Sequence, residues 1–489
     1  MNLTLLYPEI TLFSGALIIL MSDVFLGKKF KDFFYFSHLL SLIFCSIAIY
    51  FTVNNFTANE LIFNNSFISN GFTSIAKAVM LMLLIFIILI SLGFIFTIKR
   101  ISAEFLALLM IASVGGMILV SANDFLVFYL GLELQALSLY LLAALNRHSK
   151  KSSEAGMKYF ILGSVASGIL LFGISMIYAF SGTTNFSSLM DLYRTAGAEA
   201  NSIPLAVIFG YILIIIALFF KISAAPFHMW VMDVYEGSAT IVASFFATAV
   251  KFISVLALIR LSSSLALGWI GIDKVFIFVG ILSIAVGSFG AIFQKNLKRL
   301  LAYSSIGHVG FVLLAISSFS NAGFSAAIFY MMIYSLISLG SFAFLNLIKS
   351  QNHHNETDEE NEKIFSVSAL SGLAKQNPVM AFSFATLIFS SAGIPPLAGF
   401  FSKFYVLSAL LSQASFIIST VAVLLSVVSA FYYLRIIKVM YFDVPKTEII
   451  KLVDVGNVKF IVFVAAFMNI ILIAFANSII NFIANFIVN

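Results

Sequence analysis

The sequence predicts an all-α membrane protein that crosses the bilayer many times, and composition is the first reason. Hydrophobic residues make up 61% of the 489 positions and charged residues only 10%, and the mean hydropathy is +1.08. A soluble domain of this length needs more surface charge, so a polytopic membrane protein is the class that fits. The second reason is that the apolar residues gather in runs of about 20, the length that a helix needs to cross a bilayer core.

We expect fourteen membrane-spanning helices within a single integral membrane domain, residues 1–489. The N-terminal segment lacks the basic start and the cleavage site of a secretory signal, so it counts as the first span. The predicted ranges are 5–25, 33–53, 74–97, 104–121, 124–145, 156–180, 203–223, 238–261, 273–293, 298–317, 323–348, 378–411, 414–441 and 458–486.

Basic residues concentrate in alternate loops between these spans, and they set the predicted orientation. The loops with few basic residues contain only Arg194, Lys274 and, at a helix end, Arg260. The rich set carries Lys28, Lys29, Lys31, Lys99, Arg100, Arg147, Lys150, Lys151, Lys295, Lys298, Arg299, Lys349, Lys363, Lys375, Lys446, Lys451 and Lys459. Basic loops stay in the cytoplasm, so we expect a bacterial inner-membrane protein with both termini in the periplasm.

The remaining charge and the single cysteine exclude several other classes. A formal net charge of +6 reflects the cytoplasmic loops and does not indicate nucleic-acid binding. Cys45 is the only cysteine, so the chain alone forms neither a disulfide nor a cysteine-ligated metal site. His353 and His354 lie in the acidic run 351–363, which we expect to be a solvated loop. The sequence has no GxxxxGK[ST] phosphate loop and no recognisable redox site, so we expect neither cofactor nor metal.

Few ionisable residues fall inside the predicted spans, and each is a candidate functional residue. A charge at mid-membrane costs about 2.5 to 3.5 kcal/mol on insertion scales and persists only for a reason. The main candidates are Glu133, Lys221, Lys251 and Lys403, and the weaker ones are Lys158, His228 and His308. Lys251 lies deepest in its span, which favours a functional or paired role.

For Lys158, for His308 and for a further lysine, Lys77, a structural role remains open. Lys158 and Lys77 stand near helix ends, where a lysine can extend its ammonium to the lipid headgroups. His308 is equally compatible with a buried histidine whose hydrogen bonds are satisfied and with a proton carrier.

Prolines interrupt two of the predicted spans, each beside a candidate lysine. The stretch AGIPPLAGFFSKFYVL, residues 392–407, must break the twelfth helix, because proline removes a backbone donor and blocks the preceding turn. Broken backbone at membrane depth has to line a polar cavity. Lys221 followed by SAAPFH repeats this arrangement in the seventh span. Two broken helices five spans apart predict two inverted five-helix repeats, about 104–261 and 273–441.

A carboxylate and three lysines within one membrane domain predict a proton relay. Burial weakens the hold of a lysine on its proton and a nearby carboxylate strengthens it, so moving the counter-charge releases the proton. Any redox or ATP energy would have to come from a partner.

Three stretches carry a family resemblance: FFKISAAPFHMWVMDVYEGSAT, NLKRLLAYSSIGHVGF and AGIPPLAGFFSKFYVL. Together they resemble the antiporter-like subunits of respiratory complex I (NADH-quinone oxidoreductase) over nearly the whole chain. PFHxWxxDVYEG is similar to the subunit N group, the counterpart of mitochondrial subunit 2, more than to subunits L or M. In the family, prolines commonly stand where this chain has Met232 and Ser238-Ala239, a difference that touches no titratable position.

The resemblance implies a proton-translocating membrane subunit coupled to quinone reduction elsewhere in the complex. It implies other membrane subunits and lipid as partners, and no NADH, flavin, cluster or quinone site in this chain. Residue by residue, it places the family's glutamate at Glu133, its three lysines at Lys221, Lys251 and Lys403, and its histidine after the break at His228.

Other functions remain open at this stage. They are an Mrp-type cation/proton antiporter subunit, a membrane subunit of an energy-converting hydrogenase, and a purely structural spacer. The DVYEG sequence argues against the first, and four intramembrane charges argue against the last. Lys403 helps to separate subunit N from subunit M, where the resemblance implies a glutamate.

Overall fold

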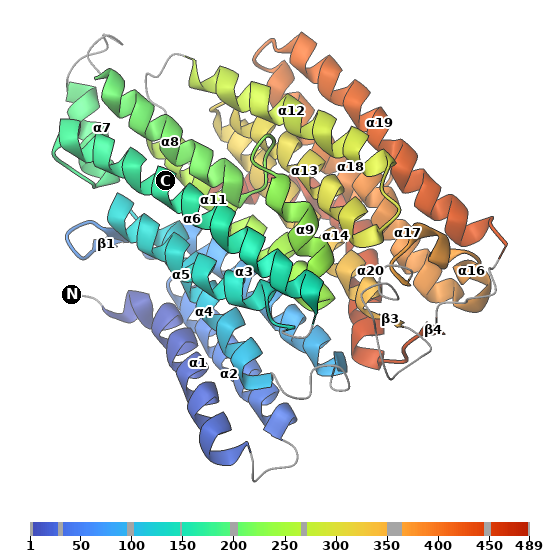
Figure 1. The fold of residues 1–489 in the computed structure, drawn as a ribbon. Coiled ribbons are helices and arrows are strands. Elements are labelled where there is room, and N and C mark those ends of the chain that lie inside the picture. Colours follow the sequence, from blue (N-terminus) through green and yellow to red (C-terminus); the bar gives the residue numbers. More distant parts are fainter. Residues whose placement is uncertain are drawn as a thin grey trace. The chain divides into compact units, whose positions relative to one another are not determined.

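The computed structural model describes residues 3–27, 33–94, 102–146, 149–195, 204–265, 271–349, 364–444 and 451–487, which are mostly helical (Figure 1). Several loop residues named above lie outside the described residues. They are Lys28, Lys29, Lys31, Lys99, Arg100, Arg147, Lys446 and the acidic run 351–363 with His353, His354 and Lys363.

The chain forms two compact units. Unit 1 comprises residues 1–145, 156–222 and 249–272, and unit 2 comprises residues 146–155, 223–248 and 273–489. The first unit therefore contains the candidates Glu133, Lys158, Lys221 and Lys251. The second contains His228, His308 and Lys403.

Unit 1 is built from helices with one short hairpin, β1 (Glu60–Ile62) paired antiparallel with β2 (Phe67–Ser69). A short 3-10 turn, Leu3–Leu6, precedes its first helix. Its helices are α1 (Tyr7–Leu26), α2 (Phe33–Asn54), α3 (Gly71–Ser91), α4 (Ser102–Ser121), α5 (Phe125–Ala143), most of α6 (Lys150–Ser181), α7 (Phe186–Thr195), α8 (Leu205–Lys221) and α11 (Lys251–Leu265).

Unit 2 contains the second halves of both broken spans and the C-terminal helices. A two-residue pairing of β3 (Ile348–Lys349) with β4 (Lys451–Leu452) joins two of its loops. Its helices are α9 (Met229–Gly237), α10 (Thr240–Phe245), α12 (Ile272–Ile292), α13 (Leu297–Ile316), α14 (Asn321–Asn346), α16 (Leu373–Gln376), α17 (Pro378–Ala392), α18 (Ala398–Leu411), α19 (Phe416–Tyr441) and α20 (Gly456–Ile487).

The predicted spans are confirmed. Within the described ranges, twelve helices are long and apolar enough to cross a membrane. The two remaining predicted spans consist of shorter helices: the seventh contains α8, with α9 following after the break, and the twelfth contains α17 followed by α18. The seventh span breaks earlier than predicted, because α8 ends at Lys221 itself and not at Pro226. Neither α7 nor the β1–β2 hairpin was predicted from the sequence.

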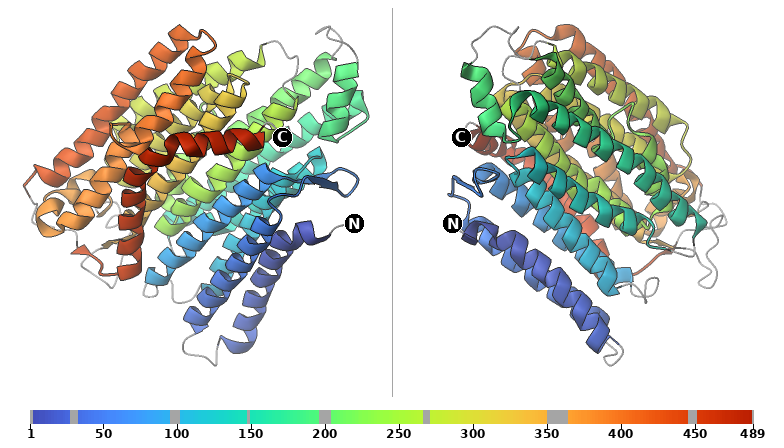
Figure 2. Two further views of the ribbon diagram at one scale, coloured as in Figure 1. Left: turned by 180° about the vertical axis from the view of Figure 1, so that it is seen from behind. Right: turned by 60° about the vertical axis from the view of Figure 1, so that its left-hand side comes forward.

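The first three helices of unit 1 are fixed by packing and by one buried ion pair. Helices α1 and α2 run side by side as an antiparallel pair (Figures 1 and 2). The Lys77 ammonium on α3 lies 2.7 Å from the Glu9 carboxylate on α1, and both side chains are buried. Lys77 therefore does not extend to the headgroups, because a partner within the protein neutralises its charge.

Glycines bring α4 and α5 into close contact. A methyl group at Gly115 would lie 2.4 Å from the backbone nitrogen of Gln135, and one at Gly131 would lie 2.7 Å from that of Leu119. Only glycine permits such an approach of two helix backbones. The crossing fixes the rotation of α5, the helix that carries Glu133.

Candidate functional site

Glu133 lies in the middle of α5, whose start is fixed by Asp124. The Asp124 carboxylate accepts a hydrogen bond from the Leu126 amide at 2.8 Å, an N-cap that orients the first turn. One carboxylate oxygen of Glu133 is buried and has no hydrogen-bond partner among the described residues. Two positions later, both amide atoms of buried Gln135 also lack a partner in the described part of the chain. Buried polar atoms usually have partners, so these two side chains of α5 are exceptions within the described part of the chain.

Lys221 is the last residue of α8 and is buried. Its ammonium finds no hydrogen-bond partner in the described ranges, and the Glu133 carboxylate lies close enough to act on it electrostatically. A space about the size of one water molecule adjoins Lys221, between α5, α6 and α8, with Tyr140 and Tyr159 in its lining. A lysine at the C-terminal end of a helix is also favoured by the helix dipole.

Lys251 follows a local change in helix geometry. The eighth span begins as α10, passes through one π-helical turn at Phe246–Val250, and continues as α11 from Lys251. Such turns in long helices are frequent at functional sites, because they re-aim the next side chain and free a carbonyl. Lys251 is only 2% exposed.

The second break is stabilised by side chains from two helices. The Gly399 amide donates to Ser390 Oγ at 3.0 Å, and that hydroxyl donates to the Asn469 side chain at 2.8 Å. Asn469 lies in α20 and is fully buried. These contacts pair a backbone donor that the break would otherwise leave unsatisfied.

Lys403 lies on α18 and reaches back across this break. Its ammonium donates to the Ala392 carbonyl at 2.7 Å, at the C-terminal end of α17. The last carbonyls of a helix lack intrahelical donors and carry partial negative charge, so they hold a cation well. The ammonium also lies 5.3 Å from the centre of the Phe311 ring.

His308 on α13 is held between two tyrosines. Its Nδ1 is 2.8 Å from the Tyr330 hydroxyl and its Nε2 is 3.0 Å from the Tyr433 hydroxyl. The Tyr433 hydroxyl also hydrogen-bonds to Ser304. A water-sized space adjoins His308, Tyr433 and Lys403. His308 thus has satisfied hydrogen bonds and also borders a space that leads to a lysine.

The two remaining candidates lie at helix ends. His228 directly precedes α9 and is partly exposed, as is its neighbour Met229. Lys158 lies in the third turn of α6 and is partly exposed.

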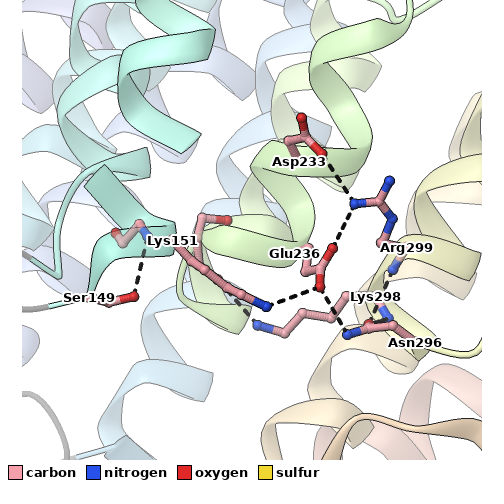
Figure 3. Close-up of polar contacts among 9 residues, drawn as sticks. Ser149, Lys151, Asp233, Glu236, Asn296, Lys298 and Arg299 are labelled. Carbon is pink, nitrogen blue, oxygen red and sulfur yellow. Dashed lines mark hydrogen bonds and ion pairs between the residues drawn. The ribbon is translucent and has the colours of Figure 1, made fainter. Parts of the chain in front are cut away.

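A network of charged residues anchors α9 within unit 2 (Figure 3). The Arg299 guanidinium on α13 lies 2.8 Å from Glu236 and 3.2 Å from Asp233, both on α9. The Lys151 ammonium at the start of α6 lies 3.5 Å from Glu236, and Lys298 donates to the Ser238 carbonyl at 3.2 Å. The DVYEG sequence therefore contributes its two carboxylates to a structural link between α9 and the start of α13.

The uncharged polar residues near the candidates were not predicted from the sequence. Tyr330, Tyr433 and Ser304 surround His308, and Gln135 lies near Glu133. Uncharged polar residues lower the mean hydropathy of a span only slightly, so hydropathy does not reveal them. The sequence feature that could have indicated this site is the clustering of serine and tyrosine around residues 304 and 432.

The family match and the relatives of this chain name the same kind of protein. A family described as NADH:quinone oxidoreductase/Mrp antiporter, transmembrane, matches residues 122–429. NADH-quinone oxidoreductase subunit N of Paramagnetospirillum magneticum is 44% identical over 389 residues, 78% of this chain and 77% of that protein. The protein of the same name from Pelagibacter ubique is 40% identical over 449 residues, 91% of each chain.

Solved structures share the fold at lower identity. A chain of respiratory complex I from Thermus thermophilus with bound aureothin superposes with a TM-score of 0.79 at 24% identity, covering 96% of this chain and 98% of that one. A chain of the Mrp complex from a Dietzia species gives a TM-score of 0.82 at 18% identity, covering 100% and 98%. At these identities the likeness concerns the fold alone.

Proposed function

Since the chain belongs to the subunit N family of NADH-quinone oxidoreductase, we propose that it moves protons across the membrane through buried ionisable residues. The observation that carries this proposal is the buried ammonium of Lys221, which lies within electrostatic reach of Glu133. Among the described residues this ammonium has no hydrogen-bond partner, and a water-sized space adjoins it.

The proposed chemistry in unit 1 is electrostatic proton transfer. Glu133 helps Lys221 to hold its proton, and a change in the charge or position of Glu133 allows the ammonium to release it to water in the adjoining space. Lys251 extends the proposed relay beyond the π-helical turn, and Lys158 is proposed as its outer member. His228, which belongs to unit 2, is proposed as an outer member of the relay in that unit.

In unit 2 the proposed relay passes through Lys403 and His308. The carbonyl of Ala392 gives the Lys403 ammonium a defined resting position. The water-sized space beside it also borders His308 and Tyr433, so a proton can pass between the lysine and the imidazole through one water. An imidazole serves such a transfer well, because one ring nitrogen accepts a proton as the other donates one.

The subunit supplies no redox chemistry in this proposal. It holds no cofactor, and quinone reduction elsewhere in NADH-quinone oxidoreductase drives the transfer. Its proposed partners are the neighbouring membrane subunits of that complex and the lipid bilayer. We place it in the bacterial inner membrane with both termini in the periplasm. A reporter fused after Lys151 should read cytoplasmic and one after Asn489 periplasmic, and two fusions reporting the same side would contradict that orientation.

Replacing Lys221 with methionine tests the proposal. Lys221→Met removes the charge and keeps a long apolar side chain, so packing changes little. We expect assembled complex with strongly reduced proton uptake and quinone-linked NADH oxidation, measured in the same inverted vesicles with assembly checked on a native gel. Lys274→Met is the matched control, because Lys274 is exposed at the start of α12. Wild-type rates in assembled Lys221→Met complex would exclude Lys221 from the relay.

A further inference from the structure

A second water-sized space borders His308 and, unlike the first, does not border Lys403. It is bordered by Ser304 and His308 of α13, by Tyr334, Ser338 and Ser341 of α14, and by Ser391 of α17. The first space, toward Lys403, shares Ser304, His308 and Ser391 with it. His308 and these two serines therefore border both spaces, each large enough for about one water molecule.

Helix α14, which lines one side of this second space through Ser341, carries three buried polar atoms without a partner in the described part of the chain. The Ser341 hydroxyl, the Ser335 hydroxyl and the Asn346 side-chain oxygen have no hydrogen-bond partner among the described residues. These residues are 2%, 1% and 4% exposed. By contrast, Ser325 on the same helix donates to the Asn321 carbonyl at 2.7 Å. Since buried hydroxyls are normally satisfied, water is the partner that suits Ser341.

The second space lies toward one defined end of unit 2. Helix α13 starts at Leu297 and α14 ends at Asn346, and the short turn between them makes the two helices antiparallel. Ser304 and Ser341 therefore both lie between His308 and the end that carries Lys298 and Arg299. His308 is ten residues from Lys298, which corresponds to about 15 Å along the helix. Basic residues at that end predict that it faces the cytoplasm.

Spacing places the polar residues of α14 along one face of the helix. Tyr334, Ser338 and Ser341 are separated by four and three residues, the intervals that bring side chains to the same side. Ser335 and Asn346 flank this row, and Asn346 is the last residue of the helix. The row thus continues from the level of His308 to the basic end of unit 2.

We propose that the space between His308 and Ser341 is part of a water-filled path by which His308 exchanges protons with the basic, cytoplasmic end of unit 2. A proton arriving through this water reaches Nδ1 of the imidazole through the Tyr330 hydroxyl, which is hydrogen-bonded to that nitrogen. The other nitrogen releases its proton through the Tyr433 hydroxyl to the water beside Lys403, so no net charge remains on the tyrosine. This inference rests on the proposed function. It adds a separate point at which protons enter unit 2.

Substitution of Ser341 tests the path in the assembled complex. Ser341→Val adds methyl groups that occupy the space and exclude water, and we expect proton uptake and quinone-linked NADH oxidation to fall about tenfold, equivalent to about 1.4 kcal/mol of barrier. Ser341→Ala removes the hydroxyl but leaves room for water, so we expect it to keep most of the rate. Ser325→Val is the matched control on the same helix, at a serine that does not border either space, and it should retain the wild-type rate.

The Lys221→Met variant separates failure of this inference from failure of the proposed function. Reduced rates in Lys221→Met together with wild-type rates in assembled Ser341→Val would overturn the path and leave the relay intact. Wild-type rates in both variants would remove the proposed function as well. Equal losses in Ser341→Val and Ser325→Val would mean that overpacking of α14 causes the defect, and would also overturn the path. If Ser341→Val fails to assemble, Ser338→Val serves as the second variant and must lower the rate for the path to stand.

Discussion

Substituting Gly393 by alanine perturbs Lys403 without removing any ionisable group. Gly393 ends α17 with a left-handed backbone, φ +81°. A methyl group there would lie 2.8 Å from Lys403 Cδ and 3.0 Å from its Nζ. Because these atoms form the flexible end of a long side chain, the lysine can move aside and the fold should survive. The expected consequence is that its ammonium loses the hydrogen bond to the Ala392 carbonyl.

The expected loss of rate follows from the hydrogen bond that Lys403 loses. A hydrogen bond to a charged group contributes about 1.5 to 3 kcal/mol. If the relay needs protonated Lys403 at the Ala392 carbonyl in each cycle, losing that bond lowers the population of this state by roughly tenfold to a hundredfold. Gly393→Ala should therefore assemble normally, with proton uptake and quinone-linked NADH oxidation reduced by up to that factor.

Gly182→Ala provides the control for backbone strain. Gly182 also has a left-handed backbone, φ +70°, but a methyl group there would meet nothing within 4 Å. Both substitutions incur about 1 to 2 kcal/mol of left-handed strain, and only Gly393→Ala displaces a lysine. Both rates are measured in inverted vesicles and normalised to assembled complex. Equal rates in the two variants and the wild type would refute the assigned role of the Lys403 contact with Ala392.

Three further predictions concern other parts of the chain. Lys77→Met leaves the Glu9 carboxylate buried without its partner at a cost of about 3 to 5 kcal/mol, so the complex should lose its activity faster on heating. Adding Glu9→Gln to the same chain should restore most of the half-life of activity. An unchanged half-life in the Lys77→Met single variant would contradict a buried ion pair. Glu133→Asp should keep much of the quinone-linked rate because it retains the carboxylate, whereas Glu133→Ala should lose most of it, and similar rates in both would exclude an ionised Glu133 from the relay. The purified chain alone should oxidise no NADH, and sodium/proton exchange by it in liposomes would favour an antiporter.

The sequence alone determined the membrane-spanning architecture. Apolar runs of spanning length and the prolines at 226, 395 and 396 act locally, because each helix must satisfy its own backbone in lipid and each proline must interrupt it. The buried lysines were equally visible, since charge in an apolar run is conspicuous. The exact start of the first break was not predictable from Pro226, because the turn that ends α8 at Lys221 depends on its surroundings.

Only the tertiary structure decided which partners these residues have. Lys77 pairs with Glu9 on another helix, and His308 bonds with tyrosines 22 and 125 positions away. Serine and tyrosine hydroxyls give no distinct sequence signal, because serine can bond to its own helix backbone and tyrosine packs like an apolar ring. The division of the candidates between two units, with Lys221 in one and Lys403 in the other, likewise follows from long-range packing. The charged residues are visible in the sequence because they interrupt apolar runs. Their contacts depend on which helices pack around them in the folded protein.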